Sequence, residues 1–395
     1  MTVSKKFRLR VIRLRNPLIL FAASSVGLVG LLFFRLKSSV PGLSASEAAS
    51  LASSVSWSQI INNPLNMPYK LAVFGLVKWQ HGGVFMLRSV SAIFAIAMIY
   101  LFYYVLRQWY ARRTAILGTT LFATSSWLLH YARLAQPDIM YIALIAAITY
   151  GTWLRQTKKT SLVIVVGGLL AVFLLYIPGL IWLVIAGGWW QRRSIFKHYR
   201  HYTVTGLIMI TVSAGLLVPL IYGLATHPNL IRQLFGLQLP GYPDVWAVLR
   251  SIAIIPYQLA VHANVNPVVW LGNLPLLDVF ALAMLVLGIY KHFFMRGLDR
   301  ARVLLGIAVI SVVLIGFGIV NTIILLPVLY ILVASGIGLM LQQWFTVFPR
   351  NPLAGLIGTT LISLAVLMTM FYHINHYYIA WPNSNDTKSV FIVKP

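Results

Sequence analysis

The sequence contains no cysteine and has few charged residues for its length. Of its 395 residues only 9% are charged, and only 6 are Asp or Glu, whereas roughly a quarter of an average soluble domain is charged. The absence of cysteine excludes disulfide bonds, thiolate nucleophiles and cysteine-ligated metal centres. The scarcity of charge excludes an ordinary soluble globular enzyme.

Hydrophobic residues, in contrast, make up 59% of the chain, and the mean hydropathy is +0.84. A membrane-spanning helix needs about 17 to 25 mostly apolar residues, and the sequence offers about eleven candidates. They cover residues 17–34, 84–106, 115–131, 139–154, 161–177, 179–190, 202–225, 276–290, 303–320, 322–345 and 353–374. We therefore expect an all-α integral membrane protein in which residues 17–374 form one transmembrane domain. The first apolar run is expected to be a span and not a cleaved signal peptide.

The direction of the spans follows from the basic residues. The formal net charge is +25, and most Lys and Arg residues gather in clusters. These clusters lie at residues 5–15, 107–113, 155–159, 192–200, 291–302 and 350. Cytoplasmic loops collect Lys and Arg, and the clusters fall in alternate loops only if residues 161–190 form a hairpin that turns at Tyr176-Ile177-Pro178-Gly179. This predicts a cytoplasmic N-terminal segment, 1–16, and an outer C-terminal tail, 375–395. A nucleic-acid partner is not favoured, because the clusters are divided among separate inner loops.

The predicted outer loops differ from the inner ones. Two are long, 35–83 and 226–275, and a short one covers 132–138. Residues 69–80 read as a helix lying at the interface, and the loop 226–275 is expected to hold one or two more. The tail after Trp381 is short and polar, so we expect it to be poorly ordered or laid on the surface.

The acids are few enough to be considered one by one. They are Glu47, Asp138, Asp244, Asp278, Asp299 and Asp386. Asp299 and Asp386 read as solvated charges, and Asp244 and Asp278 read as helix caps. Glu47 follows Ser44 at the spacing of a capping box, which is its structural interpretation. Asp138 lies at the rim of two spans, where an ionisable group is costly and by default a functional candidate; its structural alternatives are a cap or an ion pair with Arg133.

An ordered set of motifs makes the chain similar to a known superfamily. The set consists of Ser46-Glu47-Ala48-Ala49, Asn66-Met67-Pro68-Tyr69-Lys70, residues 86–94, residues 121–138 and residues 271–278. In this order the motifs resemble the GT-C membrane glycosyltransferases, in particular the family 39 group of protein O-mannosyltransferases and lipid A aminoarabinose transferases. The resemblance covers residues 17–190 best.

One position departs from the family pattern. The first outer loop of the family usually carries Asp-Glu, and the Asp is assigned the role of catalytic base. Here Ser46 stands in place of that Asp and only Glu47 is kept. The departure suggests that Glu47 has taken over the base role, or that the acceptor or the activity differs.

The resemblance implies a sugar donor on polyprenyl phosphate, an inverting transfer on the outer face of the membrane, and a protein, lipid or glycan acceptor. Glu47 is then the expected base and Asp138 its partner. Cations for the departing lipid phosphate are expected among Lys70, Arg133, Arg88, Arg232 and Arg250, of which Lys70 and Arg133 are favoured because they flank the acids. No obligatory metal or other cofactor is expected, because two carboxylates without nearby histidines make a weak metal site. His130 and His262 are expected to be buried structural residues, with substrate binding as the alternative.

Two other functional classes remain open at this stage. A transporter or flippase of lipid-linked sugars is disfavoured because transporters place charged residues near the midplane, whereas these acids lie at the outer rim. An inactive GT-C scaffold that acts as a binding subunit is suggested by Ser46. In each case the expected location is the plasma (inner) membrane.

Overall fold

The computed structural model describes residues 17–80, 83–156, 161–237, 244–263, 266–294, 299–318, 320–349 and 351–393. Apart from two isolated β-bridges, between Leu43 and Val393 and between Leu237 and Gly318, the described residues form helices, turns and loops only. The all-α prediction is therefore confirmed for this part of the chain.

Helices occupy each of the predicted spanning ranges. They are α1 (Pro17–Phe33), α5 (Val84–Trp109), α6 (Arg112–Thr124) with α7 (Ser126–Ala132), the 3₁₀ helix η1 (Pro137–Ala143) with α8 (Leu144–Gln156), α9 (Ser161–Leu175), α10 (Leu180–His201), α11 (Thr203–Thr226), α14 (Val279–Phe294), α15 (Asp299–Gly316), the 3₁₀ helix η2 (Thr322–Leu325) with α16 (Leu326–Val347), and α17 (Pro352–Asn375).

Five helical segments within the described ranges are long and apolar enough to cross a membrane. They are Val84–Trp109, Pro137–Gln156, Thr203–Thr226, Thr322–Val347 and Pro352–Asn383. Shorter apolar helices cover Ala22–Phe33, Ser161–Leu175, Val245–Ala260 and Val279–Phe294. The membrane character is thus supported, while the count of about eleven spans stays a prediction.

The turn at 176–179 is present where the Pro-Gly pair predicted it. Gly179 has a φ of +78°, a left-handed conformation that glycine adopts without a steric penalty. The helix that follows, α10, continues to His201, beyond the predicted span that ends at 190. The apolar run ends near 190, but the backbone remains helical through a basic segment, so hydropathy alone could not mark this terminus.

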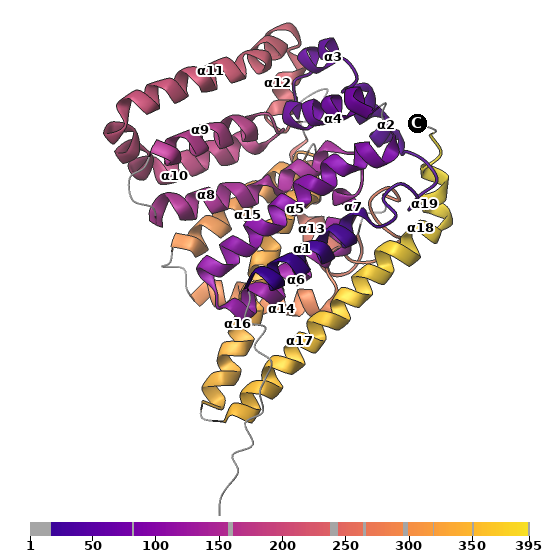
Figure 1. Ribbon diagram of the computed structural model, residues 1–395, viewed down its shortest axis with the longest axis vertical. Helices are drawn as coiled ribbons and strands as arrows, with labels where there is room; N and C mark the ends of the chain where they lie inside the picture. Colours follow the sequence, from indigo (N-terminus) through magenta and orange to yellow (C-terminus); the bar gives the residue numbers. More distant parts are fainter. Residues whose placement is uncertain are drawn as a thin grey trace, which may run out of the picture.

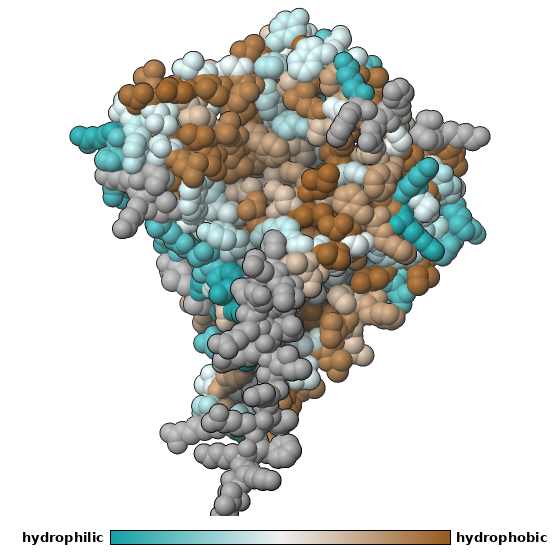
Figure 2. Space-filling view, in the orientation of Figure 1, coloured by the Kyte–Doolittle hydropathy of each residue, from teal (hydrophilic) through white to brown (hydrophobic). Residues whose placement is uncertain are grey.

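The closest packing in the bundle joins α14 to α16. A Cβ added to Gly336 would overlap the carbonyl oxygen of Met284, and one added to Gly288 would overlap that of Leu332. Small residues at such positions let two helix backbones approach, which is how helices associate in membranes. The helix α11, in contrast, leaves Val204, Leu207 and many other apolar side chains exposed. Figure 2 shows the hydrophobic surface over α11 and α9, as expected of a lipid-facing side.

Short helices cover one end of the bundle. The loop 35–83 contains α2 (Ala45–Ala52), α3 (Trp57–Asn62) and α4 (Met67–Gln80), and the loop 226–275 contains α12 (Asn229–Leu234) and α13 (Val245–Ala260). After α17 the chain forms the π-helix η3 (His376–Ala380), α18 (Trp381–Asn383) and α19 (Asn385–Val390). Helices are therefore present in both long loops, and their position at the membrane interface stays a prediction.

The C-terminal tail fits the second of the two expected alternatives, because it is laid on the surface of the bundle with most of its residues at least partly exposed. Trp381 and Phe391 have no exposed surface, and Val393 pairs with Leu43. The two large aromatic side chains therefore anchor this surface segment to the core.

The loops predicted to lie on one side of the membrane do gather at one end of the bundle. At the end that contains Glu47, Asn66 N–H donates to the Tyr176 carbonyl at 2.7 Å and Leu237 pairs with Gly318. At the opposite end Arg155 pairs with Asp299, and Arg300 donates to the Trp109 carbonyl. We call these the Glu47 end and the Asp299 end. In Figure 1, α2, α4, α18 and α19 lie at the right, and the turn from α10 to α11 lies at the left.

Candidate functional site

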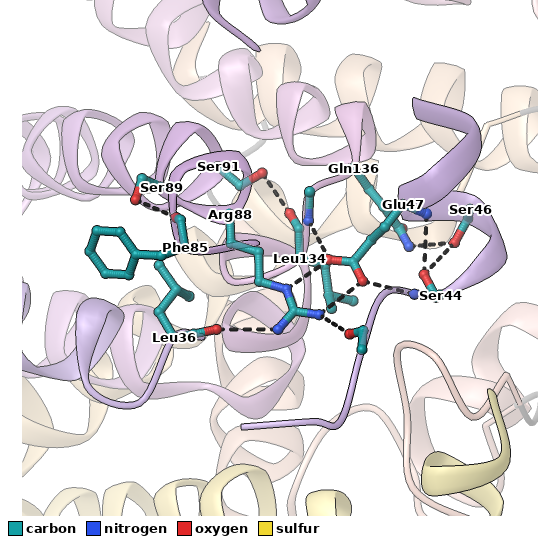
Figure 3. Close-up of polar contacts among 12 residues, drawn as sticks. Leu36, Ser44, Ser46, Glu47, Phe85, Arg88, Ser89, Ser91, Leu134 and Gln136 are labelled. Carbon is teal, nitrogen blue, oxygen red and sulfur yellow. Dashed lines mark hydrogen bonds and ion pairs between the residues drawn. The ribbon is translucent and has the colours of Figure 1, made fainter. Parts of the chain in front are cut away.

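Glu47 and Arg88 form a buried ion pair at the Glu47 end. Arg88, on α5, donates from Nε to Glu47 Oε1 at 2.9 Å and from Nη2 to Oε2 at 3.0 Å, and neither side chain is exposed. The guanidinium also donates to the carbonyls of Leu36 (3.2 Å) and Gly42 (2.9 Å). Figure 3 shows how Arg88 thereby joins α5 to the loop that precedes α2.

The same carboxylate completes the predicted capping box. Ser44 N–H donates to Glu47 Oε2 at 3.1 Å, Ser44 Oγ accepts from Glu47 N–H at 3.2 Å, and Ala135 N–H donates to Oε1 at 2.8 Å. Both oxygens therefore accept two hydrogen bonds each, in a site without exposed surface. This geometry suits an anchor between α2, α5 and the loop before η1. The base role of Glu47 stays a prediction that these contacts do not favour.

Ser46, the position that departs from the family pattern, lies beside a second polar side chain. Gln136 Nε2 donates to Ser46 Oγ at 2.6 Å, and Ser46 Oγ is 3.0 Å from Ser44 Oγ. Ser46 is exposed whereas Gln136 is buried. Ser46 and Glu47 therefore contact adjacent residues of the loop that leads to Asp138, Ser46 through Gln136 and Glu47 through Ala135.

Asp138 is held in a different setting. It is the second residue of η1, after Pro137, and is partly exposed. Its Oδ2 accepts a hydrogen bond from Asn321 Nδ2 at 2.5 Å, across 183 positions of sequence. Within the described residues Asp138 Oδ1 accepts no hydrogen bond. The alternative ion pair between Asp138 and Arg133 is not formed among these residues, because Asn321 is the partner of Asp138. One carboxylate oxygen is thus available to a bound molecule.

A polar cavity of about 460 Å³ opens next to this carboxylate. Tyr131 and Trp127 of α7 form one wall, Arg250 and Gln258 of α13 form another, and Asn321 connects the cavity to Asp138. The remaining lining residues come from the chain before α14 and the connection from α15 to η2. The predicted outer loop 226–275 therefore encloses this space together with the ends of several predicted spans and Asn321, which lies between two of them.

The five predicted phosphate-binding cations lie in different surroundings and do not form one cluster. Arg250 lines the cavity and is exposed. Arg88 forms the buried ion pair with Glu47 and is not exposed. Lys70 Nζ donates to the Asn63 carbonyl at 2.6 Å, and burial lowers the pKa of Lys70 to about 8. Arg232 is partly exposed on α12 and, like Lys70, is not a lining residue of this cavity.

Arg133, the fifth, is buried among aromatic rings. Its guanidinium carbon lies 4.9 Å from the ring centroid of Tyr377 and 4.5 Å from that of Tyr378, and Nη2 donates to the Phe34 carbonyl. Nε and Nη1 have no hydrogen-bond partner among the described residues. Unpartnered buried guanidinium nitrogens are costly, so the two nitrogens could each donate a hydrogen bond to an anion.

His130 belongs to the same aromatic cluster. The centroid of its ring lies 4.7 Å from the ring centroid of Trp381, 5.4 Å from that of Trp270 and 5.9 Å from that of His376. His376 opens the π-helix η3, a distortion that is frequent at functional sites. Trp270 also lines the cavity, so the cluster and the cavity share a wall. His130 is fully buried, as predicted, whereas His262 is only partly buried.

Asp278 caps α14 as expected, and it has a further partner. It accepts from Phe280 N–H at 2.9 Å and from Ala281 N–H at 3.0 Å. His373 Nε2 lies 3.0 Å from Asp278 Oδ2, and His373 Nδ1 lies 2.9 Å from Ser126 Oγ. This chain of three side chains ties α7, α14 and α17 together beside the aromatic cluster.

Comparison with known proteins adds no assignment. The sequence matches no protein-family profile, and neither curated proteins nor solved structures match it. The resemblance to GT-C enzymes therefore depends on the motifs alone. Among the described residues no three His, Asp or Glu side chains come close enough to hold a metal ion.

Sequence reasoning missed several residues that the structure gathers here. Asn321 is a neutral amide at the start of an apolar helix. Only its position at a span boundary indicates in the sequence that it is a candidate site residue. Trp270 and His376 lie in segments without a motif. Their proximity arises from contacts between loops more than 100 residues apart, as when Trp381 Nε1 donates to the Pro267 carbonyl 114 positions away.

Proposed function

We propose that the chain is a membrane glycosyltransferase that moves a sugar from a polyprenyl-phosphate-linked donor to a hydroxyl-bearing acceptor at the Glu47 end. In this proposal Asp138 is the general base, Asn321 positions it, and Glu47 with Arg88 forms the scaffold of the site. The order of the GT-C-like motifs supplies the reaction class, and the arrangement around Asp138 supplies the residue roles.

One observation carries the assignment of the base. Asp138 is an acid with an available oxygen, and its partner Asn321 lines the same polar cavity as Arg250. Glu47, the alternative, is sealed by four hydrogen bonds. A base must reach the proton that it removes, so accessibility favours Asp138.

The proposed reaction needs one proton transfer and one displacement. Asp138 Oδ1 takes the proton of the acceptor hydroxyl while the acceptor oxygen attacks the anomeric carbon of the sugar. The bond from that carbon to the phosphate oxygen breaks, and its electron pair leaves with the polyprenyl phosphate. Arg250 stabilises the charge that develops on the phosphate, and Arg133 is the second cation suited to this task. Attack opposite the leaving group inverts the anomeric centre.

Transfer measured with full-length protein in detergent tests the proposal. A panel of labelled polyprenyl-phosphate sugars is incubated with the protein and an acceptor fraction, and release of polyprenyl phosphate is followed. Asp138→Asn should lower turnover about 10²- to 10⁴-fold, as expected for a lost general base. Asp386→Asn, an exposed acid on α19, is the matched control. Equal turnover in wild type and Asp138→Asn would show that Asp138 is not the general base.

A second variant tests the positioning of the base. Asn321→Leu removes the donor to Asp138 Oδ2 but keeps the carboxylate. Because a hydrogen bond to a charged group contributes roughly 1.5–3 kcal/mol, we expect kcat to fall about tenfold or more with KM for the donor little changed. Asn321→Asp should not restore kcat, since its side chain offers no amide donor to Asp138. A KM effect alone would reassign Asn321 to donor binding.

The alternative classes give different results in the same assay. A transporter or flippase would move the lipid-linked sugar across proteoliposomes without releasing polyprenyl phosphate. An inactive scaffold would bind the donor and do neither, in wild type and in Asp138→Asn alike.

A further inference from the structure

A second groove lies at the Asp299 end, on the far side of the bundle from the cavity. It has a volume of about 270 Å³ and runs between α8, α10 and α15. Its walls are largely apolar, with Ile148, Leu183 and Ile307 among the lining residues. It shares no residue with the cavity beside Asp138.

Three arginines stand at the mouth of this groove. They are Arg155, Arg300 and Arg302, and one acid, Asp299, lies among them. Arg155 donates to Asp299 at 3.0 Å and Arg302 donates to it at 2.7 Å, with both pairs substantially exposed to solvent. Arg300 donates to the Trp109 carbonyl at 3.2 Å. Three guanidinium groups against one carboxylate leave the mouth with an excess of positive charge.

The groove is open because glycines line it. A Cβ added to Gly187 or to Gly306 would meet no atom within 4 Å. A neighbouring groove of about 240 Å³, between α8, α9 and α10, shares Leu183, Gly187 and Gln191 with the first. Two apolar channels therefore adjoin beneath one cationic mouth.

Gln191 adds an independent indication of a polar ligand. It lies where the two grooves meet, and its buried Oε1 has no hydrogen-bond partner among the described residues. A buried amide oxygen without a donor is costly. A hydroxyl group of a bound molecule would satisfy it.

We propose that these grooves form a binding site for one anionic phospholipid with a hydroxyl-bearing headgroup. The phosphodiester lies on Arg300 and its neighbours, the acyl chains occupy the two grooves, and a headgroup hydroxyl donates to Gln191 Oε1. Basic pockets between helices on the positively charged side of a membrane protein are suited to such lipids. The site is separate from the proposed transfer reaction and does not depend on it.

Thermal unfolding of the full-length protein in mixed micelles tests the site. Phosphatidylglycerol, which is anionic and hydroxylated, should raise Tm in a saturable way, whereas phosphatidylcholine should not. Arg300→Gln should weaken phosphatidylglycerol binding about tenfold, the effect of losing one charge-assisted hydrogen bond. Arg192→Gln, an exposed arginine at the same end that does not line the groove, should leave the affinity unchanged.

A filling variant tests the groove itself. Gly306→Leu projects into open space, so Tm in phosphatidylcholine should not fall, but the Tm increase with phosphatidylglycerol should vanish. Gly215→Leu, at an equally open position on α11, should keep the increase. A retained increase in Gly306→Leu, or equal effects of the two lipids, would overturn the proposal. Glycerol phosphate should give no increase; an increase equal to that of the lipid would reveal a small-anion site instead. The readout involves no sugar transfer, so its failure leaves the proposed function untouched.

Discussion

Arg88 Nε lies 2.9 Å from Glu47 Oε1 in a pair that has no exposed surface. The sequence suggested separate functional roles for these residues, one as a base and the other as a phosphate-binding cation. Their pairing removes both from the solvent-accessible site and makes them the link between α2 and α5. In the proposed reaction the roles of base and phosphate-binding cation are therefore given to Asp138 and Arg250.

We predict that the loss of either partner strongly destabilises the folded chain. Glu47→Gln leaves the Arg88 guanidinium buried with its charge uncompensated, and removing one partner of a buried pair costs about 3–5 kcal/mol. Arg88→Lys keeps the charge but loses the two-pronged geometry, so it should also be destabilised. Thermal unfolding in detergent should show both losses, with turnover per folded molecule of Glu47→Gln close to wild type. Normal stability with lost turnover would instead restore Glu47 as the base.

Lys70 gives a prediction about pH. Burial lowers its pKa from 10.5 to about 8 in the folded chain, while the unfolded chain has an ordinary lysine. The charged form is therefore penalised by folding below about pH 8. Stability should rise as pH increases from 8 to 10.5, because the folded chain releases this proton first.

Lys70→Met identifies the source of that rise. The apolar side chain has similar length and no proton to release, so the increase in Tm between pH 8 and 10.5 should be smaller than in wild type. If the predicted contact with a donor phosphate exists, donor lipid should stabilise wild type more at pH 7 than at pH 9.5, with Lys70→Met showing no such difference. A pH slope that is identical in both proteins would rule out Lys70 as its cause.

The close contact between α14 and α16 predicts that Gly→Ala substitutions differ in their effect on stability. Gly336→Ala places a methyl group against the backbone carbonyl of Met284, which cannot rotate away. Overpacking costs typically 1–3 kcal/mol, and a rigid neighbour favours the upper part of that range. Gly306→Ala, in open space on α15, should be neutral or stabilising because alanine has the higher helix propensity. Comparing Tm for the two variants checks the register of α14 against α16.

Local patterns in the sequence predicted much of the fold, and they failed where distant segments meet. The turn at Gly179 and the capping box at Ser44 depend on neighbouring residues, so composition and spacing suffice. The Arg88–Glu47 pair joins positions 41 residues apart, and the bond from Asn321 to Asp138 spans 183. No local pattern carries such contacts. The candidate acid Asp138 could be identified by its cost at a span boundary, but its partner could not.

Ser46 provides the sharpest distinction between an enzyme and an inactive scaffold. Its Oγ accepts a hydrogen bond from Gln136 Nε2 at 2.6 Å and is exposed near the loop that leads to Asp138. Ser46→Asp would place a carboxylate on the same amide donor without disturbing the Glu47–Arg88 pair. If Asp138 already serves as the base, the added carboxylate is redundant, and turnover should change less than about tenfold with Tm within a few degrees of wild type.

An inactive scaffold gives the opposite pattern in the Ser46→Asp experiment. Wild type would then show no transfer, and the variant would gain it only if the missing acid is the sole defect. Ser46→Asn, which has the same shape without the charge, is the matched control for either outcome. Because the substitution lies at an exposed position, a large fall in Tm would mean that Ser46 is held more tightly by Gln136 and Ser44 than one hydrogen bond to each allows. Measured turnover of wild type beside these two variants thus decides whether the departure at position 46 removed the activity or left it to Asp138.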